Sequence, residues 1–170
     1  MPNQDDAQAL ERARQDQRQG KAPTTQAGEF IREEMQHIRE GKHGARSPQQ
    51  AIAIGLSKAR RAGVDLPPPG KGKASARTRA SAKREYQRGQ ESPGLHEADP
   101  KRSRAAIGAL KREGRSAASP AALSDQASQA AARRSPAERS AAARKASATK
   151  GPAKRSAAAQ KAARSRARDN

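Results

Sequence analysis

The chain contains no cysteine and no tryptophan, and its only aromatic residues are one phenylalanine and one tyrosine. The absence of cysteine excludes disulfides and thiolate-bound metals. Large apolar residues are also scarce: Leu, Ile, Val and Phe number 13 in 170 residues, whereas alanine accounts for 39. Such a content, combined with high net charge, is typical of disordered chains. We therefore expect at most one small packed element. No apolar run approaches the ~18 residues of a membrane span, so we expect no membrane partner.

Charge is what the sequence has in abundance, and it is unevenly distributed. The formal net charge is +19 and the pI is about 11.5. Residues 1–46 hold eight basic and eight acidic residues, so residues 47–170 carry the whole excess. The densest run, residues 133–168, has 12 basic residues and Glu138 as its one acid. A chain this basic is expected to bind a polyanion. Its polar N-terminus predicts a cytoplasmic location rather than secretion.

The large apolar residues concentrate between Phe30 and Leu66, which predicts four segments. These are a polar N-terminal segment (1–23), a helical hairpin (24–66), a basic Pro/Gly-containing linker with a helix (67–102) and a disordered Ala/Arg/Lys/Ser-rich tail (103–170). The predicted fold class is mostly α with extensive disorder: a short helical hairpin plus a long basic low-complexity tail of latent helices. Residues 7–19 have helical composition, but Leu10 is their one large apolar residue, so we expect a frayed helix.

Helical periodicity and turn signals define the predicted hairpin. Apolar residues at i, i+3 and i+4 predict a first helix from about Thr25 to Glu40, with Thr24 or Thr25 as its cap. The sequence Ser47-Pro48-Gln49-Gln50 is a capping box that begins a second helix. Gly55 or Ala59 would let the two helices approach closely. The predicted hairpin core consists of Phe30, Ile31, Met35, Ile38, Ile52, Leu56, Ala59 and Val64.

No pattern in the sequence predicts an active site. The histidines are His37, His43 and His96. Glu34 and His37 have the spacing of half a metal site on one helix, but no second half accompanies them. We therefore expect a solvated helix surface, no metal and no cofactor. Residues 41–44 (Gly-Lys-His-Gly) resemble the Gly-x-x-Gly loop of K-homology domains, which contacts nucleic-acid backbones. The strands of that fold have no counterpart here, so an ordinary turn between helices is favoured.

The basic tail is the strongest functional signal. A helix that carries Arg and Lys among small residues can approach phosphates closely and release their counterions. The scarcity of aromatic residues argues against stacking on single strands. We predict a non-enzymatic protein that binds duplex DNA with little sequence preference and associates with the nucleoid. The candidate phosphate contacts are Lys58, Arg60, Arg61, Lys71, Lys73, Arg77, Arg79, Lys83, Arg84, Lys111, Arg112, Arg133, Arg134, Arg144, Lys145, Lys154, Arg155, Lys161, Arg164, Arg166 and Arg168.

Two other interpretations stay open. The first is a basic protein that associates with RNA or the ribosome. The second is a protein-interaction adaptor, in which the hairpin binds a protein partner or a second copy of the chain and the tail only solubilises it.

Two stretches of the sequence resemble known proteins. Residues 29–42 (beginning Glu29-Phe30-Ile31) and residues 47–61 (containing Ala51-Ile52-Ala53-Ile54-Gly55) resemble an uncharacterised family of small basic bacterial proteins. Those proteins share a helix, a Gly/Lys turn and a second helix. The Ala/Lys/Arg/Ser tail is similar to bacterial histone H1-like proteins, although arginine outnumbers lysine here. The resemblance implies DNA association and no particular enzymatic activity.

Overall fold

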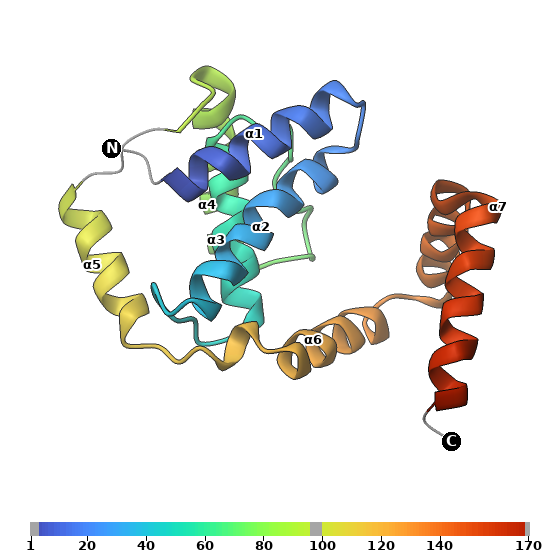
Figure 1. Cartoon of the computed structure of the whole chain (residues 1–170). Helices are drawn as coiled ribbons and strands as arrows, with labels where there is room; N and C mark the ends of the chain where they lie inside the picture. Colours follow the sequence, from blue (N-terminus) through green and yellow to red (C-terminus); the bar gives the residue numbers. More distant parts are fainter. Residues whose placement is uncertain (1–3, 96–99, 169–170) are drawn as a thin grey trace. The chain divides into compact units, whose positions relative to one another are not determined.

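The chain is almost entirely helical in the computed structural model, which describes residues 4–95 and 100–168 (Figure 1). Two compact units are distinguished, residues 1–126 and residues 127–170. Within the first unit α2 packs against both α1 and α3, and α3 packs in turn against α4. The elements in chain order are α1 (Gln4–Arg18), α2 (Pro23–Arg39), α3 (Pro48–Arg61), α4 (Ala76–Glu91), α5 (Pro100–Lys111), the 3-10 turn η1 (Ser116–Ala118), α6 (Pro120–Ala132) and α7 (Pro136–Arg168).

The prediction of extensive disorder is wrong, because residues 103–168 are mostly helical as well. Alanine is the strongest helix former, so an Ala-rich segment needs few other contacts to prefer the helix. The segment after α5 belongs to the first unit, where η1 packs against α2 and α3. Ala117 and Ala118 are buried there, and the guanidinium of Arg39 donates to the carbonyl of Ala118 at 3.0 Å. Residues 103–126 of the expected tail are therefore part of the first unit.

The N-terminal helix α1 is likewise more firmly held than predicted. Leu10 is not its only anchor, because Ala9 and Ala13 are buried on the same face as part of one apolar cluster with α2 and α3. Asp16 is also buried, and its carboxylate accepts from Lys21 Nζ at 2.6 Å. Small side chains thus let α1 lie close to its neighbours, where a count of large apolar residues predicts fraying.

The two hairpin helices confirm the periodicity argument, while one of their predicted caps is wrong. The hydroxyl of Ser47 accepts from the backbone N–H of Gln50 at 3.2 Å and begins α3 as expected. Helix α2, however, begins at Pro23 after Ala22, with no side-chain cap. Proline at the first position needs no donor partner and presets the helical φ, so neither Thr24 nor Thr25 is required as a cap.

The packed residues form two apolar clusters rather than one hairpin core. The first joins α1, α2 and α3 around the fully buried Phe30 and Ala59, with Val64 beside them. The second joins Met35 and Ile38 of α2 to η1. Of the predicted core residues, Ile31, Ile52 and Leu56 are half-buried and pack against these clusters.

Close helix contacts occur where α3 meets its neighbours, and glycine makes them feasible. A Cβ added at Gly55 would lie 2.8 Å from the Cα of Ile31 in α2. A Cβ added at Gly89 of α4 would lie 1.8 Å from the carbonyl oxygen of Arg60. Both obstacles are backbone atoms, which cannot move aside without shifting a helix.

Replacing Gly55 by alanine should therefore destabilise the first unit by about 1–3 kcal/mol, the usual cost of overpacking. Gly28→Ala in α2 is the matched control, because nothing lies within 4 Å of its added Cβ. That change should instead stabilise the helix by about 0.5–1 kcal/mol. Thermal unfolding followed by circular dichroism measures both, and equal effects of the two variants would contradict the close contact.

The second unit contains the end of α6 and the long helix α7. Gly151 interrupts α7 with non-helical torsion angles, φ 67° and ψ 167°, immediately before Pro152. The basic helix is therefore two shorter helices in series. Among the described residues, no helix combines the length and apolar character that a membrane span requires.

Candidate functional site

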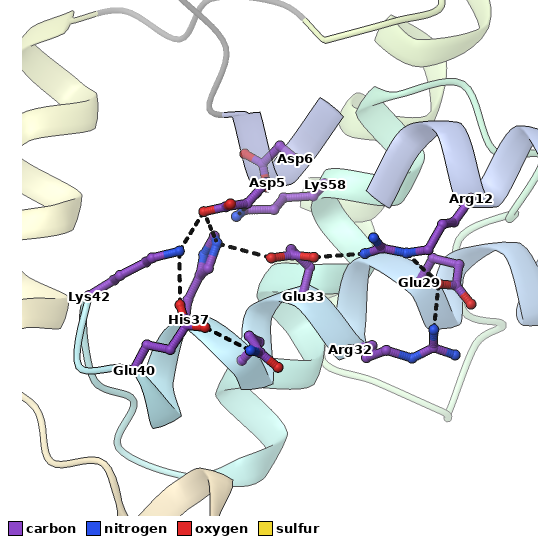
Figure 2. A network of polar contacts seen from close by, with 11 residues as sticks. Asp5, Asp6, Arg12, Glu29, Arg32, Glu33, His37, Glu40, Lys42 and Lys58 are labelled. Carbon is purple, nitrogen blue, oxygen red and sulfur yellow. Dashed lines mark hydrogen bonds and ion pairs between the residues drawn. The ribbon is translucent and has the colours of Figure 1, made fainter. Parts of the chain in front are cut away.

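A network of ion pairs connects α1 to α2 (Figure 2). Arg12 projects from α1 and uses two nitrogens: Nε donates to Glu29 Oε2 at 2.9 Å and an Nη donates to Glu33 Oε2 at 2.7 Å. Glu29 also accepts from Arg32 at 2.9 Å. Positions 29 and 33 are one helical turn apart, so both carboxylates lie on the face of α2 that meets α1.

The network continues to the start of α1 and the end of α2. Asp5 Oδ2 accepts from Lys42 Nζ at 2.6 Å and lies 3.0 Å from His37 Nε2, while Glu33 Oε1 lies 3.4 Å from the same nitrogen. Lys42 also pairs with Glu40 at 2.9 Å. The hydrogen bond from Lys42 is the main cause that holds the pKa of Asp5 below its ordinary value. Asp5 is therefore an anion at neutral pH.

A second ion-pair group joins three helices in the interior. Glu34 of α2 is fully buried, with 1% of its side chain exposed. Lys58 Nζ of α3 lies 3.1 Å from Glu34 Oε2 and donates to Asp6 Oδ1 of α1 at 2.9 Å. Burial disfavours the charged form of Lys58, but attraction to Glu34 and Asp6 outweighs burial and raises the pKa of the lysine. A charged lysine thus links α1, α2 and α3.

Both described histidines lie beside this group. His43 Nε2 is 3.4 Å from Glu34 Oε1, and the rings of His37 and His43 meet edge to face with centroids 5.8 Å apart. Only 3% and 6% of the His37 and His43 side chains are exposed. The expectation that Glu34 and His37 form a solvated helix surface is therefore wrong. The missing partner, His43, comes from the turn after α2, where helical spacing gives no signal.

The acidic residues of the neutral N-terminal region, residues 1–46, form ion pairs within the protein. Every acidic residue in residues 1–46 takes part in an ion pair within the first unit, namely Asp5, Asp6, Glu11, Asp16, Glu29, Glu33, Glu34 and Glu40. Asp6, Glu29, Glu33 and Glu34 pair with basic residues of neighbouring helices, whereas Glu11, Asp16 and Glu40 pair locally.

Residues 41–44 form a turn whose polar groups already have protein partners. Lys42 binds two carboxylates, and His43 is buried. The backbone N–H of Gly44 donates to the carbonyl of Leu110 at 2.9 Å, and that of Ala45 donates to Gly114 at 3.0 Å. The turn therefore contacts the end of α5. The backbone N–H groups of Gly44 and Ala45 are already used in these contacts and are not available to bind a phosphate.

The predicted phosphate contacts in the first unit fall into two groups. Lys58 and Arg60 bind protein groups instead of facing solvent, since Arg60 is buried and donates to the carbonyl of Leu66 at 3.0 Å. Arg61 pairs with Glu85 at 3.2 Å, and Arg79 is half-buried. The remaining predicted residues are exposed: Lys71, Lys73, Arg77, Lys83, Arg84, Lys111 and Arg112.

The predicted contacts in the second unit share one property, which is exposure. The described basic side chains are Arg133, Arg134, Arg144, Lys145, Lys161, Arg164 and Arg166, and Arg139, which the prediction omitted, is exposed with them. Lys154, Arg155 and Arg168 belong to α7, but their side chains lie outside the described set. A basic helical surface is thus present in the part of the chain with the fewest acidic residues.

The protein is an all-α helical chain that carries a buried polar cluster and a separate basic surface. Residues 18–69 match the model of a family of unknown function (DUF6496). The matched segment contains α2, α3, the buried residues Glu34, His37 and His43, and the half-buried Lys58. Comparisons with curated proteins and with solved structures gave no match.

Proposed function

We propose that this is a non-enzymatic protein that binds the backbone of duplex DNA with little sequence preference. The observation that carries the proposal is the run from residue 133 to 168. It holds 12 basic residues against Glu138 alone, and its described basic side chains are exposed on α7 and on the turn before it. Neutralising several phosphates at once releases counterions, which supplies affinity without reading bases.

The aromatic residues favour a duplex over a single strand. Phe30 is fully buried in the first apolar cluster. Tyr86 is half-buried and its hydroxyl donates to Asp65 Oδ1 at 2.7 Å, a hydrogen bond that raises the pKa of the tyrosine. Binding of single strands relies on exposed aromatic rings that stack on bases, and neither residue is placed for that role.

The resemblance of the tail to bacterial histone H1-like proteins supports the same proposal. It extends the proposal to a cytoplasmic protein of the bacterial nucleoid. The helical hairpin would act as a docking or self-association module. Structured RNA offers the same phosphate charge as DNA, so binding to RNA is the alternative that the experiment must separate.

A triple variant of the full chain, Lys161→Gln/Arg164→Gln/Arg166→Gln, tests the proposal. Loss of three phosphate contacts should weaken duplex DNA binding about 10²-fold near physiological salt. The control, Arg14→Gln/Arg18→Gln/Arg46→Gln, changes the net charge equally in the first unit and should leave affinity nearly unchanged. Fluorescence anisotropy with labelled duplex measures both.

Two outcomes would count against the proposal. Equal losses in the two triple variants would assign binding to net charge rather than to the basic helices of residues 127–168. Preferential displacement of the labelled duplex by structured RNA, rather than by unlabelled DNA, would favour the RNA-binding alternative.

A further inference from the structure

The buried histidine–carboxylate cluster is unrelated to the basic surface and has the composition of a metal site. Glu34, His37 and His43 each offer one ligand atom, and these atoms all lie within 4.8 Å of one another. Glu34 and His37 share one face of α2, and the turn after α2 brings in His43. All three side chains are nearly inaccessible to solvent.

Hydrogen bonds at the far side of each ring determine which nitrogen is available for a metal. His43 Nδ1 lies 3.1 Å from the carbonyl oxygen of Gly44, which can only accept, so Nδ1 carries the proton. His37 Nε2 donates to the Asp5 carboxylate at 3.0 Å. In the neutral rings the lone pairs are therefore on His43 Nε2 and His37 Nδ1. Hydrogen bonds of this kind, to a carbonyl and to a carboxylate, orient histidines that bind metals.

The carboxylate of Glu34 is not satisfied by hydrogen bonds. Both of its oxygens are buried without a hydrogen-bond partner among the described residues. Lys58 Nζ lies 3.1 Å from Oε2, and Oε1 lies 3.4 Å from His43 Nε2, which would present a lone pair in a neutral ring protonated on Nδ1. Two acceptors facing each other repel unless a cation or a proton lies between them. This contact supplies a second reason, besides composition, to place a cation there.

We propose that Glu34, His37 and His43 bind one Zn²⁺ ion, with water as the fourth ligand. Two imidazoles and one carboxylate are a common zinc donor set. Calcium and magnesium prefer all-oxygen sites, so this set disfavours them. Ligand atoms around tetrahedral zinc lie about 3.3 Å apart, so the cluster would contract modestly from its present spacing. Lys58 keeps its hydrogen bond to Asp6 when the metal takes Glu34 Oε1.

The site's role would be structural, because its three protein ligands are nearly inaccessible to solvent. Zinc would fasten α2 to the turn at residues 40–47, and that turn holds the end of α5 through Gly44 and Ala45. Since the proposal concerns folding of the first unit, it is independent of nucleic-acid binding, and either can fail without the other.

The test uses the full, untagged chain after removal of metal with a chelator. Isothermal titration with ZnCl₂ should give one bound ion per chain and raise the melting temperature, whereas MgCl₂ and CaCl₂ should do neither. Co²⁺ in place of zinc should give the visible absorption of a tetrahedral site. A wild-type chain that binds no Zn²⁺, or gives no tetrahedral Co²⁺ spectrum, overturns the proposal.

Single substitutions locate the site. His43→Gln and Glu34→Gln should each weaken zinc binding at least about 100-fold. Asp5→Asn, which only orients His37, should weaken it about 10–100-fold. His96→Gln is the matched control that also removes one histidine, and it should change nothing. Circular dichroism of the metal-free variants establishes that they are folded. If His43→Gln or Glu34→Gln does not fold, Asp5→Asn decides. Unchanged affinity in Asp5→Asn, or a loss in His96→Gln, contradicts the assignment.

Discussion

The affinity of the full chain for duplex DNA is expected to fall about 10³–10⁵-fold when salt rises from about 50 to about 200 mM. This range applies if the basic helices of residues 127–168 engage about 6–10 phosphates, which is within the 12 basic residues available in residues 133–168. Each contact releases condensed counterions, and added salt removes the entropy gained by that release. Anisotropy titrations at four or more salt concentrations give the slope of log affinity against log salt.

The triple variant Lys161→Gln/Arg164→Gln/Arg166→Gln makes this prediction specific to α7. Each lost contact should reduce the slope by about 0.9 for a B-form duplex, so the variant should lose about 2.7. The Arg14→Gln/Arg18→Gln/Arg46→Gln control should keep the wild-type slope. A response to salt that is nearly flat would show that binding does not depend on phosphate contacts.

Replacing Lys58 by methionine should destabilise the first unit by about 3–5 kcal/mol. Methionine fills a similar volume, but it carries no charge. The buried carboxylate of Glu34 then has no ammonium beside it, and Asp6 loses its hydrogen-bond donor. An uncompensated buried charge costs far more than a lost surface ion pair. Urea unfolding followed by circular dichroism, with a chelator present to exclude metal, measures the change in the free energy of unfolding.

Two further variants establish the cause of that loss. Lys42→Met removes an ammonium that also binds two carboxylates but is exposed to solvent, so its stability should stay close to wild type. The double variant Lys58→Met/Glu34→Leu removes the buried carboxylate together with its ammonium partner and should recover most of the loss. If the double variant is as unstable as Lys58→Met alone, packing rather than charge explains the effect.

The hairpin helices were predictable because their signals are local. Periodic apolar residues marked α2, and the Ser47-Pro48 pair marked the start of α3. The docking of α1, η1 and the end of α5 was not predictable from composition. Those contacts depend on buried alanines, such as Ala13 and Ala118, and on Gly44, where an added Cβ would lie 2.0 Å from the carbonyl oxygen of Glu113 just after α5. A count of large side chains misses these contacts, because small residues let the backbones come close and pack without large side chains between them.

The candidate metal site was half visible in the sequence. The spacing of Glu34 and His37 placed both on one helix face, but His43, Lys58 and Asp5 come from a turn, another helix and the N-terminal helix. Their convergence is set by how α1 and α3 pack on α2, which one sequence without related sequences does not reveal. The basic surface, in contrast, could be assigned from the sequence because charge density does not depend on packing.

The ion pairing of the acidic residues in residues 1–46 has a consequence for the other end of the chain. Carboxylates tethered to a polycationic segment can compete with phosphates for its basic side chains, at an effective concentration in the millimolar range for a short flexible connection. Asp5, Asp6, Glu29, Glu33 and Glu34 are already neutralised by partners on neighbouring helices. Folding of the first unit thus pairs these carboxylates internally. The basic helices of residues 127–168 then stay available to an external ligand.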